Sequence, residues 1–152
     1  ARAALDRVIA RVNMLMLNDS EARLLTGRHN LKECARRILD AGPGYVVIKN
    51  GEHGAYLFSR NGIAIIPAYP VDDVADPTGA GDTFAGGFLG WLSRSGRTDE
   101  AAIRAGLLTG ATTASFGVEA FSLERLERLT LSEIGTRRDE LKAMTLIEDL
   151  QD

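Results

Sequence analysis

Residues 76 to 83 read Asp-Pro-Thr-Gly-Ala-Gly-Asp-Thr and place a carboxylate beside a turn that has almost no side chains. The backbone N–H groups of Gly79, Ala80 and Gly81 can converge on an anion, and the apolar run that follows predicts a helix whose positive end attracts the same anion. Asp82 then stands where a substrate hydroxyl group would lose its proton. This pattern indicates phosphoryl transfer. The alternative is a plain turn with a helix cap, because Pro, Gly and Asp are common turn residues.

The seven residues from Asp76 to Asp82 resemble the signature of the ribokinase-like (PfkB) carbohydrate kinase family, D-T/P-T-G-A-G-D. They are not a Walker A loop, whose pattern and lysine are absent. The resemblance implies that Asp82 is the catalytic base and that Gly79 to Gly81 form the anion hole of an ATP-dependent kinase, which phosphorylates an alcohol group of a sugar or sugar-like substrate. Three alternatives stay open: a nucleoside kinase of the same family, a nucleotide-binding module without catalysis, and an interaction domain in which the glycines only form a turn.

A second motif, Asn18-Asp19-Ser20-Glu21, matches the family's N-x-x-E at the end of an apolar strand pattern. In the family, this Asn and Glu help to hold magnesium and its waters against the phosphates, a role that suits Mg²⁺ because the ion keeps several waters. The competing interpretation is a capping box, in which Asn18 caps a helix and Glu21 returns to its backbone N–H. Because the phosphate motif follows downstream, we favour the metal role.

A third segment resembles the part of the family that lines the nucleotide. Residues 45 to 59 read as a buried strand, the turn Asn-Gly-Glu-His-Gly and a second strand. The resemblance makes Gly51 part of the nucleotide-lining turn and brings the Lys49 ammonium to a phosphate or ribose oxygen. The competing interpretation is an ordinary hairpin, for which Asn-Gly is the commonest signal.

The helix predicted from residue 99 to residue 115 is rich in small residues, which let another element approach closely. In the family, this helix and the loop after it wall the adenine. The resemblance therefore makes Gly106 and Thr109 adenine-facing, whereas the alternative for the small residues is tight helix packing.

The resemblance also implies a site for a monovalent cation. Gly117 falls where the family's cation loop passes, with Asp76 and the Thr78 carbonyl as the other half of the site. The implied cofactors are therefore ATP, Mg²⁺ and K⁺.

The composition excludes several classes of protein. The chain of 152 residues is 45% hydrophobic and 26% charged, which is ordinary for a soluble globular domain. Its net charge of −3 with scattered Lys and Arg offers no basic face, so we expect neither nucleic acid nor a membrane as a partner. The expected partners are ATP and a small-molecule sugar or nucleoside.

The residues of redox and metal chemistry are few. Cys34 stands alone, which excludes an internal disulfide and suits a reducing cytoplasm, the expected location. His29 and His53 lie far apart in turn-like sequence, so neither a zinc site nor a Ser-His-Asp triad is expected.

The chain begins in a helical pattern without methionine or cap, which reads as part of a longer protein. The resemblance covers residues 8 to 125 and only the carboxyl-terminal part of a family member, so the amino-terminal substrate and lid portion is expected to be missing. Specificity in the family comes mainly from that portion. We therefore expect these residues alone not to phosphorylate an acceptor, and a sheet without its partner strands to pair with a second copy in a homodimer.

The elements that must position these residues alternate between strands and helices, which predicts an α/β fold, here a layered α/β/α ribokinase-like domain. Residues 1 to 135 are predicted to form the ATP-binding and catalytic portion, and residues 136 to 152 a charged helical or disordered tail. Ser122 and Thr130 are predicted to cap closing helices. The predicted strands are 13–17, 45–49, 55–59, 63–66 and a short one at 71–74, and the main predicted helices are 19–25, 31–41, 83–93 and 99–115.

Overall fold

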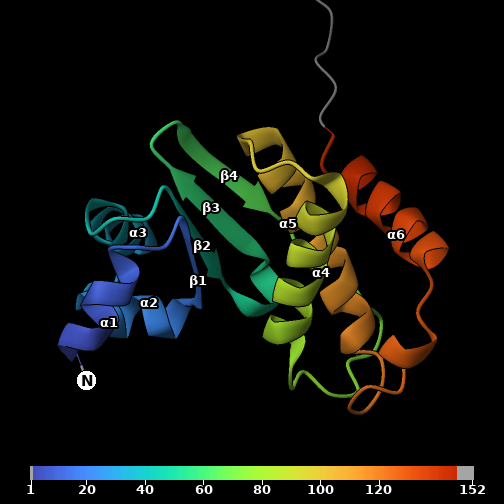
Figure 1. Ribbon diagram of the computed structural model, residues 1–152. Coiled ribbons are helices and arrows are strands. Elements are labelled where there is room, and N and C mark those ends of the chain that lie inside the picture. Colours follow the sequence, from blue (N-terminus) through green and yellow to red (C-terminus); the bar gives the residue numbers. More distant parts are fainter. Residues whose placement is uncertain (1, 147–152) are drawn as a thin grey trace, which may run out of the picture. The chain divides into compact units, whose positions relative to one another are not determined.

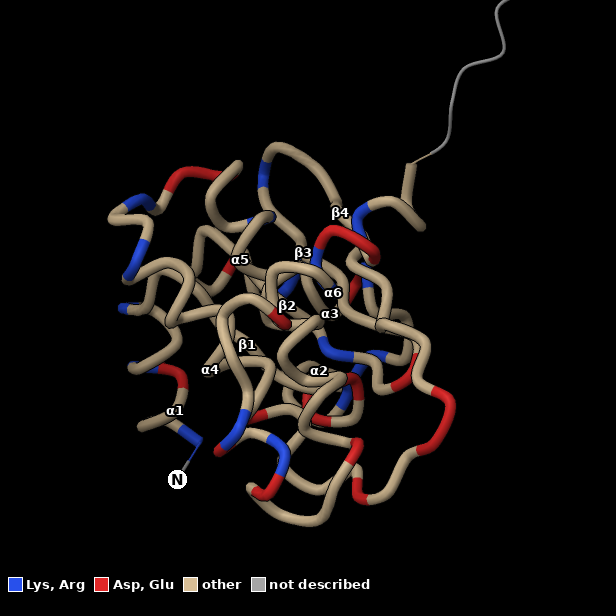
Figure 2. The backbone as a smooth tube through the Cα atoms, turned by 90° about the vertical axis from the view of Figure 1, so that its right-hand side faces the viewer, with Lys and Arg blue, Asp and Glu red and all other residues tan. Residues whose placement is uncertain are grey.

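The computed structural model describes residues 2 to 146, and the chain divides into two compact units between Ile66 and Pro67 (Figure 1). The α/β prediction is confirmed, since a mixed sheet and helices are both present. The units differ in charge. Residues 1 to 66 carry ten Lys and Arg against six Asp and Glu, whereas residues 67 to 152 carry eight against fifteen. Basic and acidic positions are interspersed along the backbone trace (Figure 2).

The first unit contains a four-stranded sheet of order β1-β2-β3-β4. The parallel pair β1 and β2 is joined through helices α2 and α3, because parallel neighbours require a crossover connection. Strand β3 runs antiparallel to both of its neighbours, β2 and β4. The elements are α1 (Arg2–Ile9), β1 (Met14–Asn18), α2 (Asp19–Thr26), α3 (Leu31–Asp40), β2 (Tyr45–Lys49), η1 (Gly51–His53), β3 (Ala55–Ser59) and β4 (Gly62–Ile66).

The core of this unit lies between α2, α3 and one face of the sheet. Register pairs such as Leu17 with Ile48 and Val46 with Phe58 put alternate strand residues on that face. The thiol of Cys34, which forms no disulfide, is buried there. The buried cluster consists of Leu17, Ala22, Cys34, Ala35, Ile38, Val46, Ile48 and Phe58.

The second unit is helical. Its elements are α4 (Ala80–Ser95), α5 (Glu100–Gly117), η2 (Leu126–Arg128) and α6 (Leu131–Met144). Glycines bring the backbones of α4 and α5 together: a Cβ at Gly87 would lie 2.6 Å from Thr113 Oγ1, and one at Gly110 would lie 2.7 Å from the Phe84 carbonyl oxygen. By contrast, Gly86 and Gly90 face open space. Of these three glycines of α4, Gly87 therefore makes the close contact with α5.

Three expectations for the second unit differ from the structure. Residues 71 to 74 form no strand, because Pro70 lacks a backbone N–H and the apolar run is only a few residues long. Ser122 lies in a loop with a positive φ of 55° and caps no helix. The expected boundary after residue 135 falls inside α6, which runs unbroken from Leu131 to Met144. Residues 147 to 152 of the predicted tail lie outside the described residues.

Candidate functional site

The signature turn lies at the amino-terminal end of α4. Gly79 is the N-cap, with a left-handed backbone (φ 78°, ψ −1°) that favours glycine, and it brings no side chain to the helix end. Its carbonyl accepts hydrogen bonds from the N–H groups of Asp82 and Thr83 at 3.0 and 2.9 Å. The Ala80 N–H donates to the Pro77 carbonyl at 3.2 Å, at the long end of the normal range. The turn thus presents bare backbone at a helix end.

Asp82 is exposed at the third position of α4. Its carboxylate makes no hydrogen bond or ion pair with any part of the chain between residues 2 and 146. The amino-terminal end of a helix favours a negatively charged side chain, so a carboxylate suits this position. The carboxylate is therefore neither sealed in the interior nor engaged by another side chain.

Asp76 organises the residues before the turn. Its Oδ1 accepts the Thr78 N–H at 2.9 Å, and hydrogen bonds from Thr78 and from the Ser122 N–H lower the pKa of the Asp76 carboxyl. The Val118 carbonyl accepts the N–H groups of Ala75 and Asp76 at 2.8 and 3.3 Å. The end of α5 is thereby attached to the start of the signature.

Gly117 belongs to the same cluster. A Cβ at this position would lie 3.2 Å from the Oγ1 of Thr83, the residue after the proposed base. The structure therefore brings together all three residues predicted for the cation loop, Asp76, Thr78 and Gly117. Cation binding itself stays a prediction.

Gly106 and Thr109 lie farther along α5. Gly106 is buried against α4, where a Cβ would meet Phe88 at 2.9 Å and Trp91 at 3.1 Å. The Thr109 hydroxyl donates to the Ala105 carbonyl at 3.0 Å. At 1.5 Å of rise per residue, Gly106 is about 16 Å along the helix from Gly117. These contacts favour the packing alternative for Gly106, and adenine contact stays an untested prediction.

In the first unit, Asn18 and Glu21 form the capping box that was the competing interpretation. Asn18 Oδ1 accepts the Glu21 N–H at 2.7 Å, and Glu21 Oε2 accepts the Asn18 N–H at 2.8 Å. Only one oxygen of the exposed Glu21 carboxylate is used in the box, so the other stays available to a ligand. Capping and metal binding are therefore compatible.

Lys49 is the register partner of Asn18 on the neighbouring parallel strand, so both lie at the carboxyl ends of their strands. In open α/β sheets this is the edge at which ligands bind. Gly51 follows in the connection from β2 to β3, with φ of 56°, and the Asn50 N–H closes this connection onto the Gly54 carbonyl at 2.7 Å. The predicted strand, turn and strand are confirmed, and contact with a nucleotide stays a prediction.

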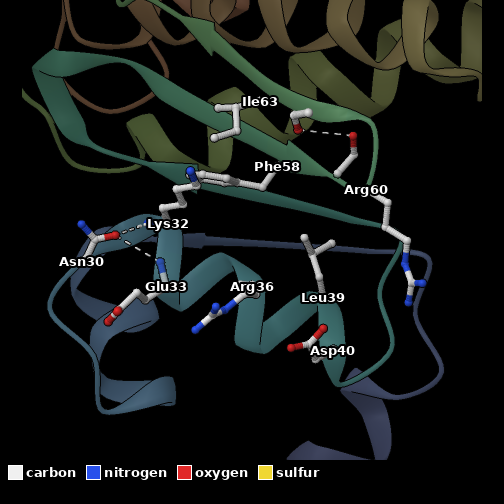
Figure 3. Close-up of a pocket in the computed structure, with 11 residues that line it drawn as sticks. Asn30, Lys32, Glu33, Arg36, Leu39, Asp40, Phe58, Arg60 and Ile63 are labelled. Carbon is white, nitrogen blue, oxygen red and sulfur yellow. Dashed lines mark hydrogen bonds between the residues drawn. The ribbon is translucent and has the colours of Figure 1, made fainter.

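A cavity of about 700 Å³ lies in the first unit between α3 and the β3–β4 hairpin (Figure 3). Phe58, Ile63 and Leu39 give it an apolar lining, with charged side chains of α3 and of the hairpin at its rim. None of the predicted site residues lines it. The cavity is therefore separate from the candidate site.

Several residues at the signature had no signal in the sequence. The Val118 carbonyl and the Ser122 N–H act through the backbone, which residue types do not reveal. Arg137, which contacts the end of α5, lies in the segment expected to be a tail.

Among residues 2 to 146, no group of three or more His, Cys, Asp and Glu is arranged to hold a metal, and no helix has the length and apolar character needed to span a bilayer.

The comparisons with known proteins agree on one family. The sequence profile described as pfkB family carbohydrate kinase matches residues 1 to 122. The cytidine kinase of Thermococcus kodakarensis is 39% identical over 108 residues, which are 70% of this chain and 38% of that kinase.

Solved structures give the same result. Aminoimidazole riboside kinase from Salmonella enterica, solved with aminoimidazole riboside and an ATP analog, superposes with a TM-score of 0.80 and 27% identity, over 90% of this chain and 46% of that one. A candidate ribokinase II from E. coli, solved with ATP and Mg²⁺, superposes with a TM-score of 0.75 and 27% identity, over 91% and 43% of the two chains. This chain thus spans less than half the length of each of these proteins.

Proposed function

The chain belongs to the pfkB family of carbohydrate kinases, and we propose that it supplies the catalytic and ATP-binding part of a kinase that phosphorylates an alcohol group of a sugar or nucleoside. The observation that carries this proposal is the exposed Asp82 without a side-chain partner, placed directly after the left-handed turn at the start of α4. Phosphoryl transfer depends mainly on positioning and electrostatics, which such a turn supplies.

In the proposed reaction, Asp82 accepts the proton of the attacking hydroxyl group as the oxygen bonds to the γ-phosphorus and the bond to the leaving ADP oxygen breaks. The amides from Gly79 to Gly81 stabilise negative charge on the transferred group. The Ala80 N–H would be shared between Pro77 and a phosphate oxygen, since three-centre hydrogen bonds are common at helix ends. We assign Lys49 and Gly51 to the nucleotide, and keep Gly106 and Thr109 as candidates for its adenine.

The residues present fit Mg²⁺ held largely through water. Asn18 and Glu21 offer an amide group and one free carboxylate oxygen, and Mg²⁺ takes few ligands from protein when it is bound with phosphates. When bound, the ion would neutralise charge on the phosphates. The E. coli structure with ATP and Mg²⁺ supports this assignment. We assign Asp76, Thr78 and Gly117 to a binding site for K⁺. The cytoplasmic location and the homodimer stay predictions.

Substituting Glu21 by Gln separates the two roles of the motif. Gln at this position still accepts the Asn18 N–H, so the stability of α2 should change by less than about 0.5 kcal/mol. Loss of the negative charge should raise the Mg²⁺ concentration needed for half-maximal activity by roughly tenfold. The matched control is Glu33→Gln, at the same position of α3. If both variants need the same Mg²⁺ concentration for half-maximal activity, Glu21 only caps α2 and does not bind the metal.

Two acceptor classes are supported by different relatives. The cytidine kinase and aminoimidazole riboside kinase favour a nucleoside, and the candidate ribokinase favours a sugar. The test is an assay of the whole protein that contains this chain, with Mg-ATP and a panel that includes cytidine, aminoimidazole riboside, ribose and fructose. We expect ADP to be released only when one particular acceptor of the panel is present. Mg-ATP binding without any transfer would favour the non-catalytic module, and no binding would favour the interaction domain.

A further inference from the structure

Arg137 of α6 joins separate segments of the second unit. Its guanidinium lies over the Phe116 ring at 3.5 Å and over the Tyr69 ring at 4.7 Å. One Nη donates to the buried Ser115 Oγ at 3.0 Å, and the other pairs with Glu119 at 2.6 Å. Only 17% of its side chain is exposed. Arg137 therefore connects α6 to the segment before the signature, to the end of α5 and to the loop after α5.

A second arginine extends this network. Arg125 pairs with Glu119 at 3.4 Å and with Glu133 at 2.7 Å, and it lies over the Phe116 ring at 4.7 Å. Glu119 is thus held by two guanidinium groups. Partly buried ion pairs of this kind are screened less by salt than exposed pairs.

The loop of residues 118 to 122 contacts the start of the signature at both of its ends. At one end, the Val118 carbonyl accepts the N–H groups of Ala75 and Asp76. At the other end, a hydrogen bond from the Ser122 N–H helps to lower the pKa of the Asp76 carboxyl. Ser122 has a φ of 55°, which is strained for a residue with a side chain and persists only where its surroundings hold it. The loop from 118 to 122 is therefore a brace for the residues that precede the turn.

We infer that Arg137 is a positioning residue, which fixes the 118–122 brace through Glu119 and thereby holds Asp76 and the Gly79 turn in the geometry that the γ-phosphate requires. This inference rests on the proposed function for its effect on turnover. Its effect on the brace itself does not depend on that function. A positional error of about 1 Å at a reacting centre lowers turnover by up to roughly a hundredfold.

The test substitutes Arg137 by Met in the whole protein, with Arg138→Met as the matched control. Arg138 is the next residue of α6 and lies over the Trp91 ring at 4.6 Å, so its variant also loses a cation–π contact but none to the brace. Hydrogen exchange is measured by mass spectrometry on peptides that contain Ala75 and Asp76, whose N–H groups bond to Val118. The turnover number and the KM of the acceptor are measured in parallel.

We expect Arg137→Met to speed exchange at these amides by about tenfold or more and to lower the turnover number roughly tenfold to a hundredfold, with the acceptor KM within about threefold of the unsubstituted value. Arg138→Met should change neither. Arg137→Lys should restore part of the loss, because a lysine keeps the charge but not the planar, two-donor contact.

Unchanged exchange at Ala75 and Asp76 in Arg137→Met, or equal changes in the two Met variants, would overturn the inference. If Arg137→Met does not fold, Glu119→Gln weakens the same ion pair while leaving the arginine in place, and the same outcomes apply. Faster exchange in a protein that transfers no phosphoryl group would support the brace and overturn the proposed function, so the two failures are distinguishable.

Discussion

Replacing Asp82 by Asn in the whole protein is expected to lower turnover by roughly a thousandfold, with the affinity for Mg-ATP changed by no more than about threefold. The amide of Asn keeps the size of the side chain and its position in the first turn of α4, but it cannot accept the proton of the attacking hydroxyl group. ATP binding is assigned to other groups, chiefly the backbone amides of the turn. The measurements are the steady-state turnover number and Mg-ATP binding by calorimetry.

The control for this substitution is Asp139→Asn, which removes an exposed carboxylate from α6 of the same unit. It should leave turnover within about twofold, because the net charge changes by the same amount but no proposed base is lost. Turnover that stays within tenfold of the unsubstituted protein in Asp82→Asn would remove the base assignment.

The second large effect is expected for Gly110→Ala, which should destabilise the second unit by about 2 kcal/mol or more. The new Cβ would lie 2.7 Å from the Phe84 carbonyl oxygen and 3.3 Å from Phe88 Cβ. The nearest atom belongs to the α4 backbone and cannot move away as a flexible side chain would. The two helices must therefore separate, and the measurement is the midpoint of unfolding in denaturant.

Gly86→Ala is the matched control, since Gly86 lies inside α4 with no atom within 4 Å of its added Cβ. Alanine should stabilise that helix by about 0.5–1 kcal/mol, because glycine loses more backbone entropy on folding. The two substitutions are chemically identical and should shift the midpoint in opposite directions. Shifts of the same sign would mean that close packing of α4 on α5 does not determine how these glycines affect stability.

The elements of the first unit could be predicted from sequence because local signals agree with one another. Continuous apolar runs on either side of a turn identify β2 and β3, and the Asn18 cap marks the start of α2. Residue types alone do not distinguish a cap from a ligand, so the sequence favours the metal role for Asn18 and Glu21, whereas the structure shows the capping box. The box satisfies backbone groups of α2 whether or not a metal is bound.

The second unit was harder to predict because its key contacts are long-range or lie in the backbone. Helical spacing puts Gly87, but not Gly86, on the face of Phe84, Phe88 and Trp91, whereas the element that Gly87 meets, α5, is known only from the structure. The left-handed φ of Ser122 has no residue-type signal, unlike that of Gly79. Arg137 stands in a charged stretch that reads as solvent-exposed, and its burial follows from Phe116 and Glu119, which lie about 20 residues earlier in the chain.

The central claim is that the backbone around Ala80 holds the terminal phosphate of a nucleotide. Its most direct test is a titration of the isotope-labelled chain with Mg-ATP and then Mg-ADP, followed by amide NMR. The Gly27 and Gly96 amides are controls, because both close helices in the same left-handed conformation, with φ of 67° and 64°. We predict that the Gly79, Ala80 and Gly81 signals shift with Mg-ATP, shift less with Mg-ADP, and that the control signals stay in place. Binding of Mg-ATP that leaves the signals of residues 79 to 81 unmoved would contradict the claim.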